Sequence, residues 1–377
     1  MAANGITLEQ LYNGFRDPDT IKMLLAKIAQ IAPQLPEPLR IMEVCGGHTH
    51  SIMKFGLHQL LPDNIDFVHG PGCPVCIMPK ERIDQAIALA QQPDVILATL
   101  GDMIRVPGSD TSLAKLRAQG ADIRALYDPL DALVLAQQNP DKTVVFFAIG
   151  FETTTPMSAV LVQQAEAMEL DNLLLHVNHV LVPPAIDAVM AGGEATINAF
   201  IGPSHVSVIT GAKIYQAAVD NYQTPLVVTG FEPVDILEGV LMLVQQAIAG
   251  EAKLEIQYRR SVSHDGNLKA QQLVADYFEL ADAFRWRGLG DIPASALRLK
   301  PQFNHRNAEL KYAQILPTDP VDDHKACMCG EILKGIKTPQ QCKVFGRGCT
   351  PQTPMGSCMV SSEGACHAHY KYAGVSL

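Results

Sequence analysis

Apolar residues fall in short runs that alternate with amphipathic segments between residues 39 and 250. The runs have the length of buried strands, and the segments between them carry apolar residues at helical spacing. This alternation predicts βαβ units and mainly parallel sheets flanked by helices. The predicted strands are Leu39–Val44, Ile65–His69, Val95–Leu100, Thr143–Ile149, Leu173–Val177, Val206–Ile209 and Pro225–Thr229. The predicted helices are Lys80–Gln91, Ser112–Gln119, Pro156–Met168 and Pro233–Ala249.

The expected fold class is therefore α/β, with two lobes and a C-terminal region of different character. A turn at Asn139-Pro140-Asp141 predicts the boundary between the lobes. After residue 255 the strand pattern fades, and we group the remainder with the N-terminal helix Ile21–Ile31. The expected units are a first lobe over 32–140, a second lobe over 141–255, and a third unit made of 1–31 and 256–377.

Composition narrows the class of protein. Of the 377 residues, 47% are hydrophobic and 18% charged, which describes a globular chain with room for more than one core. The net charge of −10 argues against nucleic acid as the main partner, because phosphate binding needs a basic face. No apolar run has the length of a membrane span, and the N-terminus lacks signal-peptide character. We expect a cytoplasmic protein that binds neither nucleic acid nor membrane.

The nine cysteines form two separate groups. In the cytoplasm they are more often ligands or redox thiols than structural disulfides. Thiolates suit iron–sulfur clusters, zinc and redox exchange. The division indicates a cluster or redox module that serves a second reactive site. The upstream group is Cys45, Cys73 and Cys76, and the C-terminal group is Cys327, Cys329, Cys342, Cys349, Cys358 and Cys366.

The first upstream thiol lies in Cys45-Gly46-Gly47-His48, directly after a predicted strand. Ligands of open α/β sheets bind at the carboxyl ends of strands. A neighbouring imidazole is able to lower the pKa of a thiol, so His48 is the candidate partner of Cys45. The alternative interpretation is a tight turn around a buried cysteine.

The second thiol loop, Gly70-Pro-Gly-Cys73-Pro-Val-Cys76, also follows a predicted strand. A Cys-X-X-Cys pair is typical of thiol–disulfide exchange or of two metal ligands, and a structural role is the alternative. If the two strands are neighbours in one sheet, Cys45, Cys73 and Cys76 converge on one reactive site.

A third strand-to-helix junction is Gly150-Phe-Glu152-Thr153-Thr154-Thr-Pro156. Open amides and hydroxyls at a helix start suit an anion, although the segment does not match the Walker pattern. A simple helix cap is an equally good interpretation. His176, His179 and His205 also lie near strand ends, but isolated histidines give no grounds to predict a metal site.

The C-terminal cysteines are separated by one, twelve, six, eight and seven residues. Zinc sites usually show two Cys-X2–4-Cys pairs, and only the first gap here is short, at a length outside that range. Four thiolates suffice for a [4Fe–4S] cluster, and the remaining two suit a redox-active disulfide beside it. A structural zinc site is the alternative.

Four motifs in this order resemble the HypD family of [NiFe]-hydrogenase maturation factors over nearly the whole chain. They are Met42-Glu-Val-Cys-Gly-Gly-His-Thr-His50, His69-Gly-Pro-Gly-Cys-Pro-Val-Cys76, Gly150-Phe-Glu-Thr-Thr-Thr-Pro156 and Ser361-Ser-Glu-Gly-Ala-Cys366. The resemblance implies two α/β lobes and a C-terminal [4Fe–4S] region similar to ferredoxin:thioredoxin reductase. It also implies a HypC-like small chaperone as partner, HypE as cyanide donor, and the hydrogenase large subunit as an indirect partner.

The resemblance further implies roles for single residues. Cys45 becomes the ligand of the iron that receives cyanide and carbon monoxide, with His48 assisting and Cys73 and Cys76 as a thiol pair. Glu152, Thr153 and Thr154 are expected to line the central cleft. The implied cluster ligands are Cys329, Cys342, Cys349 and Cys366, with Cys327 and Cys358 as redox thiols. The exchange of Cys327 and Cys329 between these roles stays open.

Two main functions follow as expectations. The first is a scaffold for the Fe(CN)2CO unit of [NiFe]-hydrogenases. Such a protein is mainly an assembly carrier with redox capability and not a conventional turnover enzyme. The second is a [4Fe–4S]-dependent protein disulfide reductase. The scaffold requires Cys45, whereas the reductase requires Cys358 and not Cys45. A third, plainer interpretation is a metal-stabilised interaction protein that needs none of the upstream thiols.

Overall fold

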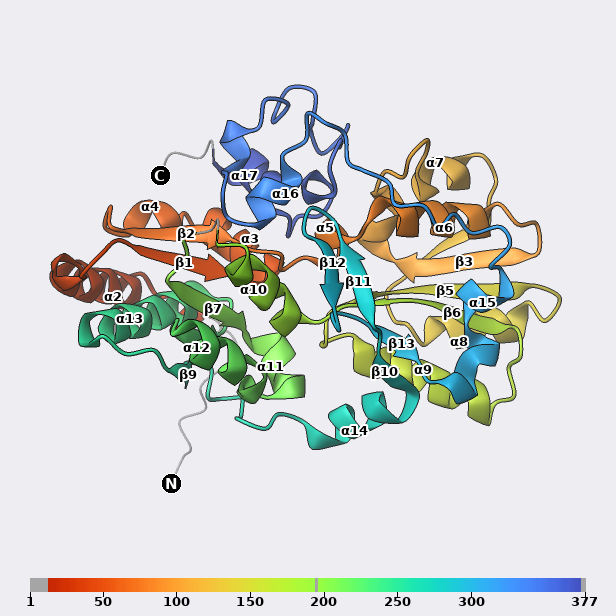
Figure 1. Cartoon of the computed structure of the whole chain (residues 1–377), viewed down its shortest axis with the longest axis horizontal. Coiled ribbons are helices and arrows are strands. Elements are labelled where there is room, and N and C mark those ends of the chain that lie inside the picture. Colours follow the sequence, from red (N-terminus) through yellow and green to blue (C-terminus); the bar gives the residue numbers. More distant parts are fainter. Residues whose placement is uncertain (1–12, 194–195, 374–377) are drawn as a thin grey trace.

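The computed structural model describes residues 13–193 and 196–373. Two parallel sheets with flanking helices lie toward opposite ends of the long axis, and the C-terminal segment covers the junction between them (Figure 1). The expected α/β class with mainly parallel sheets is confirmed. Within the two described ranges, no helix combines the length and apolar character needed to cross a bilayer.

The first sheet has five parallel strands, and its first two strands along the chain pair in continuous register. Residues 39–43 pair in step with residues 65–69, from Leu39 opposite Ile65 to Glu43 opposite His69. The order across the sheet is β2 (Ile65–His69), β1 (Leu39–Glu43), β7 (Ala199–Pro203), β8 (Leu226–Thr229) and β9 (Leu254–Ile256).

The second sheet has four parallel strands, and its long central strand is buried along its whole length. Such a strand carries a continuous apolar run because helices cover both faces of the sheet. The order is β4 (Ile123–Leu126), β3 (Val95–Leu100), β5 (Thr143–Gly150) and β6 (Leu173–His179).

Two short antiparallel ribbons follow the sheets. They pair β10 (Phe278–Leu280) with β13 (Leu297–Leu299), and β11 (Ala283–Trp286) with β12 (Gly290–Pro293). The helices before residue 150 are α2 (Pro18–Ile31), α3 (Gly46–Lys54), α4 (Leu57–Leu60), α5 (Pro74–Ile77), α6 (Lys80–Ala90), α7 (Leu113–Ala118) and α8 (Asp131–Gln138). The later helices are α9 (Thr155–Ala167), α10 (Val182–Ala191), α11 (Ser204–Thr210), α12 (Gln216–Tyr222), α13 (Pro233–Ala249), α14 (Leu268–Tyr277), α15 (Ala308–Lys311), α16 (Cys329–Leu333) and α17 (Ala365–Tyr372).

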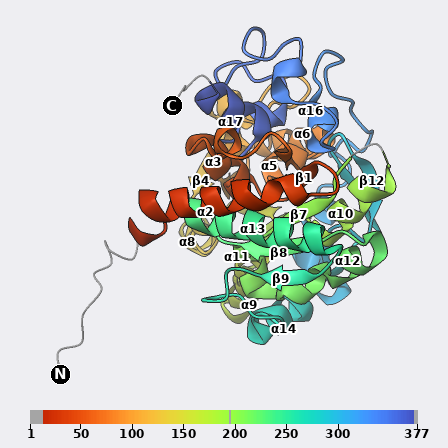
Figure 2. The same ribbon diagram turned by 90° about the vertical axis from the view of Figure 1, so that its left-hand side faces the viewer.

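Helix α13 shows how the sequence sets an element's limits. Pro233 fits the first turn, where a missing N–H costs nothing, and Gly250 ends the helix in the left-handed conformation with φ 66°. Its apolar side packs with α2 against β1, β7 and β8 in one buried cluster (Figure 2). A larger cluster joins both sheets to the C-terminal region, so the reactive loops rest on one continuous core.

The predicted division into lobes needs correction. The boundary between 32–140 and 141–255 falls between β3 and β5, which are hydrogen-bonded neighbours in one sheet. The first sheet instead combines an early segment with the strands after residue 198. The grouping of the N-terminal helix with the C-terminal unit also differs from the structure, because Leu24 and Ile28 are buried against α13 and the first sheet.

Most predicted strands and helices are confirmed within two residues, but one strand is wrong. Residues 206–209 form part of helix α11, and the strand is β7, which ends at Pro203. A short apolar run does not distinguish a strand from a buried helix. The sequence analysis missed edge strand β4, which has only four residues, two of them, Arg124 and Ala125, exposed.

Candidate functional site

The first two thiol loops meet at the carboxyl edge of the first sheet. Strands β1 and β2 are parallel neighbours, so the loops that follow them emerge side by side. The Gly46 N–H donates to the carbonyl of Gly72 over 3.1 Å. A Cβ at Gly72 would collide with the backbone nitrogen of Cys45, so the second loop needs glycine to approach the first. The predicted adjacency of the two loops is thus present.

Cys45 precedes helix α3 and is buried, with 5% of its surface exposed. Its backbone N–H donates to the carboxylate of Glu43 over 3.1 Å. The same buried carboxylate accepts hydrogen bonds from Thr49 and, over 2.7 Å, from His69. Burial raises the pKa of Glu43, and these donors work against that rise. Glu43 therefore fixes the start of the Cys45 loop, a role that the sequence analysis missed.

The imidazole of His48 does not contact the Cys45 thiol in the predicted way. Its Nε2–H donates to the carbonyl of Gly230 over 2.9 Å, and its ring lies 4.5 Å from that of Phe231. Burial lowers the pKa of His48 to about 3, so the ring is neutral. His48 thus connects the Cys45 loop with the loop after β8. The backbone amides of Gly47 and His48 lower the pKa of the Cys45 thiol by hydrogen bonding, although burial raises it overall.

The imidazole that approaches Cys45 belongs to His205, at the start of α11. Both ring nitrogens lie 3.9 Å from the Cys45 sulfur. Burial lowers the pKa of His205 to about 4, which leaves the ring neutral and able to act as a ligand or hydrogen-bonding partner. The sequence offered only a single histidine near a strand end, and nothing in its spacing connected it with a residue 160 positions earlier.

Cys45 and His205 lie on the wall of a cleft of about 350 Å³ between the two sheets. Burial is the largest cause that raises the pKa of the Cys45 thiol, and the charge of Glu363 adds to it. An incoming metal ion would offset that cost by stabilising the thiolate. The other polar residues of the wall are Asp102, Thr153, Thr154, Ser361, Ser362 and Glu363.

The Gly150–Pro156 loop contributes to this cleft only in part. Thr153 and Thr154 line it, but Glu152 does not. The Glu152 carboxylate accepts the N–H of Val182 over 2.9 Å, and burial raises its pKa to about 7. Its second oxygen has no hydrogen-bond partner among the described residues. The structure thus gives Glu152 a buried position behind the cleft in place of the predicted lining role.

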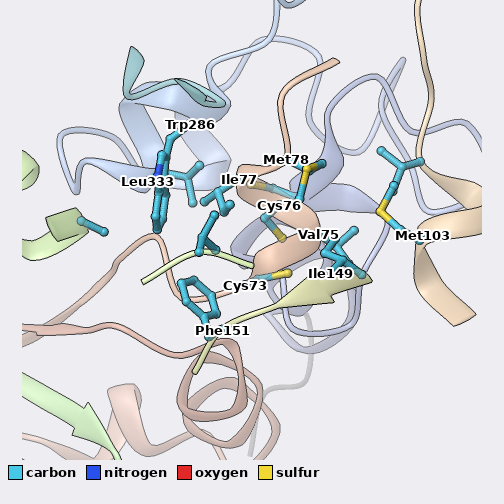
Figure 3. Close-up of a cluster of buried hydrophobic side chains, with 14 of the residues drawn as sticks. Cys73, Val75, Cys76, Ile77, Met78, Met103, Ile149, Phe151, Trp286 and Leu333 are labelled. Atoms are coloured by element: carbon cyan, nitrogen blue, oxygen red, sulfur yellow. The ribbon is translucent and has the colours of Figure 1, made fainter. Parts of the chain in front are cut away.

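Cys73 directly precedes the short helix α5 and Cys76 lies within it, and both belong to an apolar core beside Ile149 and Phe151 (Figure 3). The Ser357 hydroxyl donates to the carbonyl of Cys76, which joins this helix to the segment that carries Cys358. Burial raises the pKa of Cys76, and the thiols of Cys358 and Cys73 raise it further. Cys76, one of the two upstream thiols, therefore interacts with the C-terminal thiol of Cys358.

Cys358 lies next to Cys329 and not, as first expected, next to Cys327. The sulfur atoms of Cys329 and Cys358 are 2.6 Å apart. Hydrogen bonds from Cys329 and then Cys76 lower the pKa of Cys358. The four thiols form a buried series from Cys73 and Cys76 through Cys358 to Cys329. This geometry favours the alternative in which Cys329 is the redox thiol and Cys327 is the cluster ligand.

All six C-terminal cysteines line one small cavity. The Met355 N–H points at the Cys349 sulfur over 3.3 Å, the kind of hydrogen bond that cluster thiolates accept. The pKa of Cys366 is raised by burial and then by Cys329, Cys327, Cys349 and Cys342, so these thiols face a common centre. In residues 13–193 and 196–373, no three His, Cys, Asp or Glu side chains form a site for a single ion. The donor set fits a thiolate-bound cluster.

These features define a thiol-rich α/β protein whose reactive groups meet where two lobes and a cysteine-rich C-terminal region join. A family model described as HypD, "Hydrogenase formation hypA family", matches residues 19–373. The chain belongs to the HypD family of hydrogenase maturation factors.

Three relatives share this similarity along almost their whole length. The chain is 51% identical to hydrogenase maturation factor HypD of Azotobacter vinelandii and 49% identical to HypD2 of Bradyrhizobium diazoefficiens, with 95% of each chain covered in both cases. It is 48% identical to HypD of Escherichia coli strain K12, over 95% of this chain and 96% of that protein. A role in hydrogenase maturation follows from this membership.

Proposed function

We propose that this protein is the scaffold on which the Fe(CN)2CO unit of [NiFe]-hydrogenases is assembled, with Cys45 as the ligand of the iron. The observation that carries the proposal is the position of the Cys45 thiol on the cleft wall, with His205 3.9 Å from its sulfur. A thiolate and an imidazole are both suitable ligands of ferrous iron. The iron is cargo here, bound while its ligands are installed and then passed on.

The cleft walls suit an iron that carries small ligands. Cyanide and carbon monoxide accept hydrogen bonds through their outer atoms, and Thr153 places a hydroxyl-bearing side chain on the cleft wall. The Thr154 hydroxyl donates to the carbonyl of Phe151 over 3.1 Å and is already used. The Thr153 hydroxyl is buried and has no hydrogen-bond partner among the described residues, which makes it the candidate donor on this wall. The volume of about 350 Å³ leaves room for a segment of the small chaperone beside the iron.

The C-terminal region completes the proposal. Cys327, Cys342, Cys349 and Cys366 would hold a [4Fe–4S] cluster, which supplies one-electron transfer when bound. Cys329 and Cys358 are then left as a redox pair, and their separation of 2.6 Å supports this choice. Through Cys76 they connect with the thiol pair beside Cys45, so electrons have a path of buried sulfur atoms toward the cleft.

The partners follow from the same assignment. A HypC-like small chaperone would bind the iron together with Cys45, HypE would deliver cyanide, and the hydrogenase large subunit would receive the finished unit from the chaperone. These steps take place in the cytoplasm on this proposal. The net charge of −10 is in keeping with protein partners and not nucleic acid.

Complementation of a strain that lacks its own HypD tests the assignment of Cys45. We expect Cys45→Ala to abolish hydrogenase activity while the purified variant keeps its cluster absorption and its thermal stability. The exposed His264→Ala is the matched control and should restore full activity. Full activity in Cys45→Ala would reject the scaffold assignment.

The second candidate function is a [4Fe–4S]-dependent protein disulfide reductase. The close contact of Cys329 and Cys358 beside the proposed cluster favours it. A reductase would lose activity in Cys358→Ser and tolerate Cys45→Ala, because Cys45 is not part of the dithiol. The same complementation assay therefore separates the two functions.

A further inference from the structure

A buried ion pair lies beside the redox thiols. The Arg287 side chain is 4% exposed, and its backbone N–H donates to the carbonyl of Ile77 over 2.7 Å. Ile77 is the last residue of the helix that begins after Cys73, so Arg287 is fixed against the upstream thiol pair. Its Nε donates to the Asp323 carboxylate over 2.9 Å, and Nη2 contacts the second oxygen of the same group.

The guanidinium is also close to the C-terminal thiols. Gly288, with φ 77°, packs its backbone directly on Gly330, and a Cβ on either residue would collide with the other. Arg287 and Cys329 are the immediate neighbours of these two glycines. A cavity of about 370 Å³ has Arg287, Asp323 and Cys327 in its wall. Arg287 therefore lies beside the segment that carries Cys327 and Cys329.

Part of the arginine is unused. Its Nη1 group is buried and has no hydrogen-bond partner among the described residues. Leaving such a donor unpaired costs about 1–3 kcal/mol, so this ion pair is not optimised for stability alone. Burial lowers the pKa of Arg287, but Asp323, Cys329 and Cys327 raise it, and the net direction is upward. The side chain keeps its positive charge.

We propose that Arg287 and Asp323 are a positioning pair that sets the redox equilibrium of the Cys329–Cys358 couple. This inference rests on the proposed function, which assigns these two cysteines as the redox pair. Reduction adds negative charge to the buried sulfur atoms, so the guanidinium favours the dithiol form. The Asp323 carboxylate opposes it. Charges act strongly at such short range in a buried site.

The redox step balances with a dithiol as the reductant. The reductant gives up two electrons and two protons and forms its own disulfide. The Cys329–Cys358 bond breaks, one proton and the electron pair convert Cys358 or Cys329 to a thiol, and the other sulfur becomes a thiolate facing Arg287. The second proton goes to solvent.

The test is a redox titration of the purified, anaerobic protein in dithiothreitol buffers of fixed pH. Alkylation followed by peptide mass spectrometry gives the fraction of Cys329–Cys358 disulfide. We expect Arg287→Met to shift the equilibrium about tenfold toward the disulfide, equivalent to about 30 mV for two electrons. Asp323→Asn should shift it in the opposite direction. Arg287→Lys should stay within threefold of the natural protein.

The matched control is Arg285→Met, which removes a neighbouring arginine that is 30% exposed and pairs with Asp322. It should leave the equilibrium unchanged. A merely structural pair would make Arg287→Met and Asp323→Asn lose stability alike, without opposite redox shifts, and that result would overturn the inference. A natural protein that forms no Cys329–Cys358 disulfide would reject the redox pair itself. An intact disulfide with equal equilibria in all variants would reject only the role of Arg287.

Discussion

Single residues in this protein differ in role even where the sequence places them in one motif. Glu152 is a charged residue in the Gly150–Pro156 loop, yet it is buried and only one of its oxygens is hydrogen bonded. Its neighbours Thr153 and Thr154 face the cleft. The distinction depends on which way the loop turns after β5, and no spacing in the sequence encodes that direction.

Glu152 should make stability depend on pH. Its pKa is raised from 4.5 to about 7 in the folded state, so the folded carboxyl stays protonated where the unfolded one ionises. The free energy of unfolding therefore falls as pH rises from about 4.5 to 7. Glu152→Gln should remove this pH dependence. The free energy of unfolding of the variant, relative to that of the natural protein, should therefore be about 2 kcal/mol higher at pH 8 than at pH 5. Urea unfolding at both pH values measures it, and an equal difference at both would contradict the buried carboxyl.

His205 should be needed for metal binding and not for folding. His205→Gln removes the imidazole nitrogens 3.9 Å from the Cys45 sulfur and keeps a polar side chain of similar size. We expect at least a tenfold loss of the mononuclear iron that Mössbauer spectroscopy distinguishes from cluster iron after loading with ⁵⁷Fe. His264→Gln, on the surface, serves as the control. Equal iron retention in both variants would remove His205 from the site.

At the scale of elements, the hydrophobic pattern predicts most of the sheets but not how strands are shared between them. The strands at 39–43, 65–69, 95–100 and 143–150 are each recognisable from the chain. Strand β7 pairs with β1 across more than 150 residues, and that choice depends on packing between helices that local patterns do not specify. The strand predicted at 206–209 is part of helix α11 instead, because a short apolar run fits either a strand or a buried helix.

The N-terminal helix α2 should contribute to the stability of the first sheet and its helix α13. Ile28 is fully buried against α13 and the first sheet, whereas Met23 on the same helix is 49% exposed. Ile28→Ala should lower the free energy of unfolding by about 2–5 kcal/mol, and Met23→Ala should change it by less than about 0.5 kcal/mol. Chemical denaturation of both variants gives the comparison. Similar values for the two would mean that α2 is not packed on the first sheet.

At the scale of the whole molecule, thiols from three parts of the chain meet at one junction. The sequence showed two cysteine groups and the motifs that carry them, but not which C-terminal cysteine lies next to the upstream pair. Cys327 and Cys329 are two residues apart, and only the direction of the turn before α16 brings Cys329 to Cys358. Motif spacing therefore identifies the set of thiols, and packing divides it into ligands and redox partners.

The division of the C-terminal thiols into cluster ligands and a redox pair predicts that substituting one of each affects the cluster differently. Cys342→Ser should lose the iron–sulfur absorption, because it removes one of the four proposed ligands. Cys358→Ser should keep the absorption and lose only the disulfide. Both cysteines are buried, so a general loss of packing would affect the two variants alike. Visible spectra of both proteins, purified without oxygen, decide the matter, and loss of absorption in Cys358→Ser alone would reverse the assignment.

The central claim is that Cys45 holds the iron on which the Fe(CN)2CO unit is built. The most direct measurement is an infrared spectrum of the protein purified anaerobically together with its small chaperone, in the region of metal-bound cyanide and carbon monoxide stretches. We predict bands for both ligands in the natural protein and none in Cys45→Ala. Bands of equal strength in the variant, or a spectrum without them in the natural complex, would contradict the account.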